Sequence, residues 1–206
     1  MSQSKSSRRW LDRHFKDEYV KRARQAGYRS RAAFKLLELQ ERDRILKHGM
    51  RVIDLGAAPG GWSQIAAGLV GAGGQVIALD LLPMDPLPRV TVLQGDFRED
   101  ETLAGLLKLL GGEPADLILS DMAPNVSGQM AVDQPRMMFL CELALGLARQ
   151  VLKPGGGLAV KIFQGAGFES FQMELRASFA RVVSRKPKSS RANSRELYLV
   201  ANGFHP

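Results

Sequence analysis

The sequence has little material for covalent cross-links or metal binding. It contains one cysteine, Cys141, in 206 residues, so no disulfide can form within the chain. Because Cys141 stands in an apolar run, we expect a small buried side chain in a reducing compartment. The three histidines, His14, His48 and His205, are scattered along the chain. This combination lacks the ligand spacing of a structural zinc site, so no bound metal is expected.

Long uncharged runs are also scarce. Residues 62–79 carry no charge, but Gly71–Gly74 divides them, and Ser63, Gln64 and Gln75 add polar groups. This pattern indicates a helix, a turn and a strand rather than a membrane span. The first residues are polar and basic and lack the apolar core of a signal peptide. We therefore expect a cytoplasmic protein with no membrane partner.

Negative charge is in short supply and unevenly distributed. The net charge is +8, from 29 Lys and Arg against 21 Asp and Glu. Residues 1–51 carry a net charge of +9, residues 52–180 one of −6 and residues 181–206 one of +5. A basic end alone is typical of a solvated tail. Two basic ends that fold to one side of the protein would instead form a surface for phosphates.

What the sequence does have is a regular alternation of strand and helix patterns. Short β-branched or apolar runs predict strands at residues 51–55, 75–79, 90–93, 116–120, 157–163, 181–184 and 196–201. Helical patterns cover residues 30–44, 62–70, 101–110, 134–152 and 169–179. Ser30 is the expected N-cap of the first helix. The alternation predicts an α/β fold with a mostly parallel, doubly wound sheet and helices on both faces.

A glycine-rich turn follows the first predicted strand, in the segment Asp54-Leu-Gly-Ala-Ala-Pro-Gly-Gly-Trp62. Such glycines let the backbone approach a ligand, and the next helix offers free N–H groups. A dinucleotide site would need G-x-G-x-x-G, whereas the segment from Gly56 lacks the second glycine. Asp54 would repel a pyrophosphate but suits a cation. S-adenosylmethionine fits better, because it carries an ammonium and a sulfonium and no phosphate; a plain tight turn is the alternative.

Acidic residues recur at the ends of the other predicted strands. Asp80 ends the second strand, where a carboxylate can accept hydrogen bonds from two ribose hydroxyls. Its replacement is expected to weaken cofactor binding and to leave the unliganded protein as stable as before. Asp96 and Phe97 follow the third strand and could hold an adenine, and Asp121 follows the fourth. Each could be a solvated strand end, but ligands of open α/β sheets bind at this edge, so the repetition favours one shared site.

A lysine interrupts the apolar run Leu158-Ala-Val-Lys-Ile-Phe163. A charge in a central strand is unfavourable unless it is paired, whereas on an edge strand Lys161 would reach solvent. A pair with Asp121 would make Lys161 a candidate for accepting the proton of a hydroxyl nucleophile. It could equally orient that hydroxyl for attack, and the sequence leaves both roles open.

Six motifs resemble those of the bacterial FtsJ-type enzymes, which methylate ribose 2′-hydroxyls of large-subunit ribosomal RNA. They are Arg29-Ser-Arg-Ala-Ala-Phe-Lys-Leu, Asp54-Leu-Gly-Ala-Ala-Pro-Gly-Gly-Trp-Ser-Gln, Asp80-Leu-Leu-Pro-Met-Asp, Gln94-Gly-Asp-Phe-Arg, Ser120-Asp-Met-Ala-Pro-Asn and Ser189-Ser-Arg-Ala-Asn-Ser-Arg-Glu. The resemblance covers essentially the whole chain. It implies a Rossmann-like, S-adenosylmethionine-dependent methyltransferase fold, with a seven-stranded sheet whose final strand, residues 196–201, is antiparallel.

The resemblance also implies site residues and a reaction. The family's catalytic tetrad falls on Lys35, Asp121, Lys161 and Glu196. Its contacts with the cofactor S-adenosyl-L-methionine fall on Gly60, Trp62, Asp80, Asp96 and Asp121. The implied substrate is a uridine 2′-hydroxyl in the peptidyl-transferase region of 23S rRNA, within the large ribosomal subunit, modified late in maturation by a monomer. Relatives with the same tetrad modify other RNAs, so methyl transfer to transfer RNA and a catalytically silent RNA-binding module stay as alternatives.

The basic ends complete the expected organisation. We expect a basic N-terminal extension over residues 1–28 and a single methyltransferase domain over residues 29–206. Because Lys35 lies in the first basic segment and Glu196 in the last, a working tetrad would bring both segments to one face beside the cofactor. The residues expected to hold RNA phosphates there are Arg29, Arg31 and Arg191.

Overall fold

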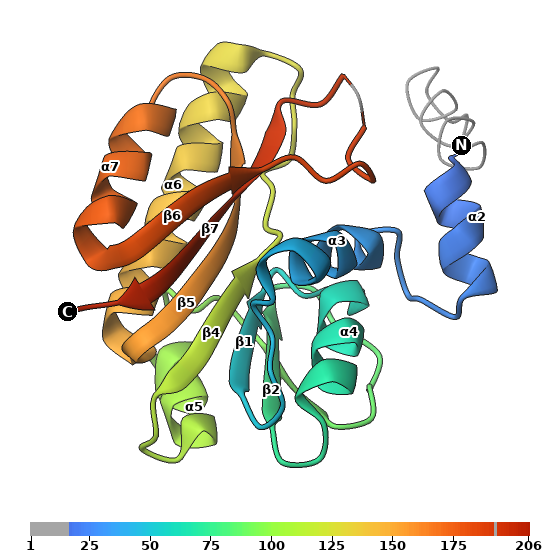
Figure 1. The fold of residues 1–206 in the computed structure, drawn as a ribbon, viewed down its shortest axis with the longest axis vertical. Helices are drawn as coiled ribbons and strands as arrows, with labels where there is room; N and C mark the ends of the chain where they lie inside the picture. Colours follow the sequence, from blue (N-terminus) through green and yellow to red (C-terminus); the bar gives the residue numbers. More distant parts are fainter. Residues whose placement is uncertain (1–16, 192) are drawn as a thin grey trace.

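A computed structural model describes residues 17–191 and 193–206 (Figure 1). Residues 1–16 of the expected N-terminal extension thus lie outside the described part of the chain. The strands are β1 (Arg51–Leu55), β2 (Gln75–Asp80), β3 (Val90–Gln94), β4 (Ala115–Ser120), β5 (Leu152–Phe163), β6 (Phe179–Arg185) and β7 (Glu196–Phe204). The helices are α2 (Glu18–Gln25), α3 (Ala33–Asp43), α4 (Gly61–Val70), α5 (Asp100–Leu110), α6 (Met130–Val151) and α7 (Phe168–Ser178). The seven predicted strands are confirmed.

All the strands belong to one sheet with the order β3-β2-β1-β4-β5-β7-β6. The pairs from β3 to β5 are parallel. β7 lies between β5 and β6 and runs antiparallel to both. The mostly parallel sheet with an antiparallel last strand is therefore confirmed. The strand order reverses between β1 and β4, and open α/β sheets bind their ligands at such a switch point.

Two apolar cores lie on opposite faces of the sheet, and neighbouring residues of β1 point into different ones. Val52 packs with α3 and α4, whereas Ile53 packs with α5, α6 and α7. Because side chains alternate along a strand, a strand covered on both faces is apolar throughout. The predicted covering of both faces by helices is confirmed (Figure 1). None of the helices in the described ranges is a candidate membrane span.

The predicted helix from Ser30 begins later than expected. α3 starts at Ala33, and its N-cap is Ala32, which has no capping side chain. Ser30 contributes its carbonyl oxygen instead, which accepts a hydrogen bond from the Ala33 N–H at 3.2 Å. Its hydroxyl lies against the start of α4, because a Cβ on Gly61 would come within 2.2 Å of it. The cap prediction was wrong because close packing on α4 holds the Ser30 side chain.

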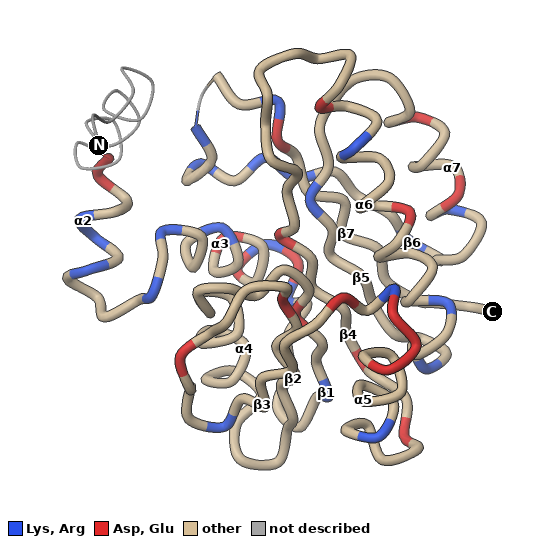
Figure 2. Tube along the Cα trace, turned by 180° about the vertical axis from the view of Figure 1, so that it is seen from behind, with Lys and Arg blue, Asp and Glu red and all other residues tan. Residues whose placement is uncertain are grey.

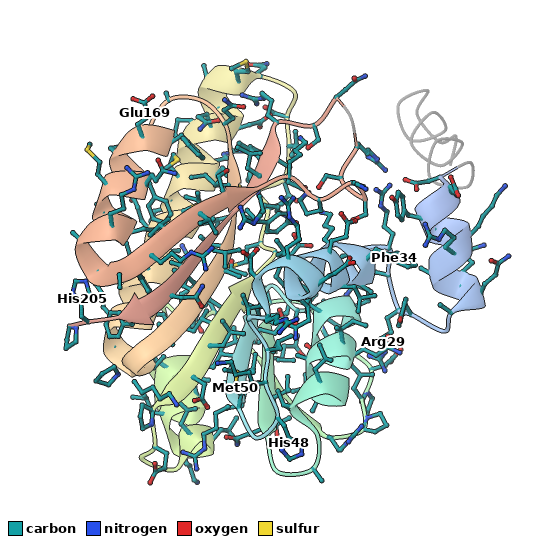
Figure 3. The ribbon with its side chains drawn as sticks, viewed as in Figure 1. Arg29, Phe34, His48, Met50, Glu169 and His205 are labelled. Carbon is teal, nitrogen blue, oxygen red and sulfur yellow. The ribbon has the colours of Figure 1, made fainter. Side chains whose placement is uncertain are left out.

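The short helix α2 has no counterpart in the sequence predictions. The Asp17 carboxylate caps it by accepting a hydrogen bond from the Tyr19 N–H at 3.1 Å. Its apolar side is small, with Val20 and Ala23 buried, and the Tyr19 ring packs 5.5 Å from that of Phe34. Figure 3 labels Phe34 at the end of α3 that faces α2. The Asp17 cap and the contacts with α3 thus stabilise this short helix together.

Candidate active site

A cavity of about 760 Å³ opens beyond the carboxyl ends of β1, β2, β3 and β4. This volume lies within the range of about 300–1,000 Å³ that is usual for small-molecule sites. The predicted residues Asp80, Asp96 and Asp121 line it, with Phe97 and Phe139 as aromatic walls. Figure 2 shows the acidic residues of this central region, at the ends of the strands. The cavity therefore combines carboxylates with apolar rings, as a cationic ligand with a flat ring requires.

The carboxylate of Asp80 connects two turns at the cavity wall. Its Oδ2 accepts a hydrogen bond from the Ala58 N–H at 2.9 Å, and its Oδ1 accepts one from the Leu82 N–H at 2.8 Å. These bonds hold the glycine-rich turn beside the segment after β2. The bonds give Asp80 a structural role beside the expected cofactor contact, because its removal would leave two backbone donors without their partner. Each oxygen keeps a further lone pair that a ribose hydroxyl could use.

Asp96 is paired with Arg98, which sequence reasoning did not foresee. The Nε of Arg98 lies 2.9 Å from both carboxylate oxygens of Asp96. Hydrogen bonds from Arg98 outweigh the modest effect of burial and hold the pKa of Asp96 below its usual range. The Arg98 guanidinium also lies 5.9 Å from the ring centre of Phe139. Asp96 thus stays ionised, and an adenine amino group would share it with Arg98.

Asp54 lies behind the cavity wall and does not line it. Only 1% of the residue is exposed. Its Oδ2 accepts a hydrogen bond from the Ser63 hydroxyl at 2.6 Å, while its Oδ1 has no partner among the described residues. Burial raises the pKa of Asp54 to about 7. A cationic ligand would offset this unfavourable buried charge, so the residues present fit S-adenosylmethionine.

Two other predicted cofactor contacts do not line this cavity either. The Trp62 indole is buried against the Tyr198 ring, with ring centres 5.6 Å apart, and its Nε1 donates to the Ala32 carbonyl at 2.8 Å. Gly60 precedes α4 in a left-handed conformation, φ 105°, that favours glycine. Gly60 and Trp62 could therefore contact a cofactor only through backbone groups at the start of α4.

The four predicted tetrad residues converge around Asp121, which is the one of the four that lines this cavity. The Nζ of Lys161 lies 2.8 Å from Asp121 Oδ1 and 2.5 Å from the Asp121 carbonyl oxygen. The Nζ of Lys35 lies 2.7 Å from Glu196 Oε1 and 3.8 Å from Asp121 Oδ1. Each residue comes from a different part of the chain: α3, the end of β4, β5 and the start of β7. Two lysines and two carboxylates thus form one buried network.

Electrostatics keep both carboxylates of the network ionised. Burial alone would raise the pKa of Asp121, but the charges of Lys161 and Lys35 outweigh it, so the pKa lies below the ordinary value. The same balance lowers the pKa of Glu196, where Lys35 is the main opposing charge. Lys35 is 9% exposed and Lys161 is 5% exposed. The network is therefore charged, paired and shielded from most solvent.

Tyr198 belongs to the same network and was missed from the sequence. It is fully buried, and its hydroxyl donates to Asp121 Oδ1 at 2.5 Å. Burial, followed by the charges of Asp121 and Glu196, raises its pKa well above the usual value, so the hydroxyl stays a donor. Tyr198 lies directly opposite Lys161 in the β5–β7 register. The signal was available, since residues two apart on a strand, such as Glu196 and Tyr198, share a face.

A second cavity, of about 440 Å³, adjoins the tetrad on the side of the basic segments. Its lining includes Lys35, Glu196, Arg31 and Arg191, so the first and last basic segments do meet there. Arg29, which Figure 3 labels, is elsewhere: its guanidinium donates to the carbonyls of Pro59, Asp85 and Pro86 at 3.1, 2.6 and 2.6 Å. These bonds tie two loops together and argue against an RNA-binding role for Arg29.

The fold and site define a methyltransferase, and comparison with known sequences gives its family. The sequence model of the FtsJ-like methyltransferases matches residues 28–204, so the chain belongs to that family, whose members in general use S-adenosylmethionine. The family resemblance and the enzyme class predicted from the sequence are confirmed. Among the described residues, no cluster of three or more His, Cys, Asp or Glu could hold a metal ion.

Similar proteins carry a more particular name. The chain is 60% identical over 198 residues to the ribosomal RNA large subunit methyltransferase E of Alkalilimnicola ehrlichii, covering 96% of this chain and 95% of that one. It is 58% identical over 204 residues to the protein of that name from Pseudomonas aeruginosa, covering 99% of each. A crystal structure of a ribosomal RNA methyltransferase from Plasmodium falciparum matches 86% of this chain and 98% of its own, with a TM-score of 0.77 and 31% identity.

Proposed function

We propose that this protein transfers the methyl group of S-adenosylmethionine to a ribose 2′-hydroxyl of large-subunit ribosomal RNA. The observation that carries the proposal is the position of the tetrad, which has Asp121 in the lining of one cavity and Lys35 and Glu196 in the lining of the other. The cavity with Asp80 and Asp96 and the cavity with Arg31 and Arg191 both reach the tetrad. A cofactor on one side and an RNA strand on the other would meet at Lys161 and Asp121.

The first cavity holds the cofactor in this proposal. Asp80 would accept hydrogen bonds from the ribose hydroxyls, Asp96 and Phe97 would hold the adenine, and backbone groups of Gly60 and Trp62 would contact the amino-acid end. When bound, S-adenosylmethionine supplies a sulfonium methyl group that is open to nucleophilic attack. The carboxylates Asp54 and Asp121 give this region a negative potential that favours the cation.

Lys161 has the central part in the reaction. An ammonium group has three donor hydrogens, and Lys161 uses two of them on Asp121. The third is free to bind the 2′-oxygen of the target ribose, which aligns it for in-line attack. Asp121 holds Lys161 in this position, and Lys35 and Glu196 shield and orient Asp121. The Lys161 ammonium has no lone pair, so in this arrangement the hydroxyl proton leaves to solvent after attack. Lys161 would accept that proton during attack only if it had first lost one of its own.

The RNA substrate follows from the relatives and the basic cavity. Relatives about 60% identical over nearly the whole chain are named for the large-subunit ribosomal RNA. We infer the same substrate here, at a uridine of the peptidyl-transferase region, modified within the subunit late in its maturation by a cytoplasmic monomer. We also infer that residues 29–206 form the catalytic domain and residues 1–28 a basic extension. The family match, which starts at residue 28, supports that boundary.

The proposal is tested by offering tritiated cofactor with large ribosomal subunits, free rRNA and transfer RNA. We expect label in the large subunit, at one linkage that becomes resistant to alkali, because a methylated 2′-oxygen cannot attack the adjacent phosphate. The Lys161→Ala variant is the matched control for background transfer. Label in transfer RNA alone would establish the alternative substrate. RNA binding without label in any substrate would make the protein a silent binding module.

A further inference from the structure

A carboxylate of the N-terminal helix lies between the two arginines of the basic cavity. Asp17 forms an ion pair with Arg31 through Oδ2, and the same oxygen lies 3.9 Å from the Nε of Arg191. The three residues come from the start of α2, the turn before α3 and the connection between β6 and β7. In Figure 2 basic residues lie on α2 and on the segment opposite it, which connects β6 and β7.

The arginines themselves form a preorganised site for an anion. Arg31 is held in place because its NH2 also donates to the Ser189 carbonyl. Burial and the positive charge of Arg191 lower the pKa of Arg31, although a guanidinium still stays charged. Two cations this close repel each other unless an anion lies between them. In this structure the anion is the Asp17 carboxylate.

The position of this site fits a phosphate of the substrate strand. Arg31 and Arg191 line the same cavity as Lys35 and Glu196. At about 440 Å³ the cavity is large enough for a small organic group such as a nucleotide. A phosphate between the arginines would therefore belong to a nucleotide at or next to the target ribose. Paired N–H donors of arginine suit phosphate oxygens as well as carboxylate oxygens.

We propose that Arg31 and Arg191 hold a backbone phosphate of the RNA, and that Asp17 occupies this phosphate site until RNA displaces it. The inference rests on the proposed function, since it names the contact that the substrate makes beside the tetrad. Asp17 is then an internal competitor that weakens RNA binding. RNAs that fill the site well overcome this competition, whereas short or poorly fitting strands do so less.

The attachment of α2 is compatible with displacement. The helix has eight residues and is anchored mainly by the side chains of Val20 and Ala23 and by the Tyr19–Phe34 ring contact. Only two side chains of this helix are buried, and one of them is an alanine, so little apolar surface holds it in place. The end of the helix that carries Asp17 can therefore move without disturbing the sheet or the cofactor cavity.

The test measures the affinity of a single-stranded RNA oligonucleotide for the whole protein at low salt. The D17N variant removes the charge but keeps a side-chain oxygen that can cap α2. The matched control is E18Q, which removes a charge from the next residue, an exposed position. We expect D17N to bind RNA at least about two- to fivefold more tightly than wild type, because a surface ion pair already contributes that much and the Asp17–Arg31 pair is largely buried. The RNA affinity of E18Q should differ much less from that of wild type. The increase in affinity caused by D17N should be smaller when R191A is also present.

Other outcomes would overturn the inference. Equal tightening in D17N and E18Q would mean that only overall charge matters. Unchanged or weaker RNA binding in D17N would mean that Asp17 is a structural partner of Arg31. Melting temperatures of all variants identify any loss of folding. Because this comparison measures binding, it stands apart from the labelling test: wild type that labels no RNA would refute the proposed function, whichever result D17N gives.

Discussion

The hydroxyl of Tyr198 offers a sharp test of how the tetrad is held. In a Tyr198→Phe variant the ring keeps its packing on Trp62, and the hydroxyl loses its hydrogen bonds to Asp121 at 2.5 Å and to Glu196 at 3.3 Å. A hydrogen bond to a charged group contributes about 1.5–3 kcal/mol. Asp121 keeps Lys161 and Lys35 as partners, so the decrease in the free energy of unfolding should lie near the lower end of this range. If the bond also orients Asp121, the rate of methyl transfer should fall by about ten- to a hundredfold.

Single-turnover methyl transfer with saturating cofactor and RNA is the measurement that separates orientation from stability. The Tyr28→Phe variant is the control, because Tyr28 packs edge-on against Phe34, outside the tetrad. Calorimetry should give nearly the same cofactor affinity for both variants and wild type. A wild-type single-turnover rate in Tyr198→Phe would refute the reasoning, and Tyr198 would then serve only to pack the interior.

Three further predictions concern the carboxylates and the buried lysine. Lys161→Ala should abolish methyl transfer in the labelling assay while calorimetry still detects cofactor binding; measurable turnover near the wild-type rate would remove Lys161 from the mechanism. Asp80→Ala should weaken cofactor binding by about 1.5–3 kcal/mol and also lower the melting temperature of the unliganded protein, because the N–H groups of Ala58 and Leu82 lose their acceptor; an unchanged melting temperature would contradict the role of these bonds. Asp54 has a folded-state pKa raised from 3.8 to about 7, so wild type should lose stability as the pH rises from about 4 to 7, whereas D54N does not titrate. Urea unfolding at pH 5 and at pH 8 should therefore show that the free energy of unfolding of D54N, relative to wild type, increases by a few kcal/mol between the two pH values. A difference between the two proteins that is independent of pH would be evidence against the raised pKa.

Much of the fold could be predicted from periodicity alone, and the errors have physical causes. The helix expected from Gln134 begins at Met130 and includes Pro135. Pro135 is the sixth residue of α6, so the helix continues through it with the loss of one backbone hydrogen bond. The Asp133 carboxylate holds the preceding loop by accepting the N–H groups of Ser127 and Gly128 at 2.8 and 2.9 Å. β5 begins at Leu152 rather than at Gly157, with an irregularity in its pairing with β4. The first half of β5 contains proline and glycine, which are uncommon in strands, so its sequence does not show a strand pattern.

The site was predictable in its types of residue but not in its pairings. Strand-end acids and a lysine in an apolar strand are visible in a sequence, and the structure brings Lys161 and Asp121 together. The Asp96–Arg98 pair and the Arg29 bonds to carbonyls depend on loop conformation, which no periodicity encodes. Tyr198 resembled a core residue because its ring is one, and only its hydroxyl belongs to the polar network.

The position of β7 makes the strand that joins β6 to the rest of the sheet also the strand that completes the reactive cluster. β7 follows β6 in the chain but lies between β5 and β6 in the sheet, so β6 has no sheet partner until β7 is in place. A molecule in which only the parallel strands have formed would already possess the cavity of Asp80 and Asp96. It would still lack Glu196 and Tyr198, which arrive together with β7. Without β7 the chain would therefore keep the residues expected to hold the cofactor and lose half of the reactive cluster.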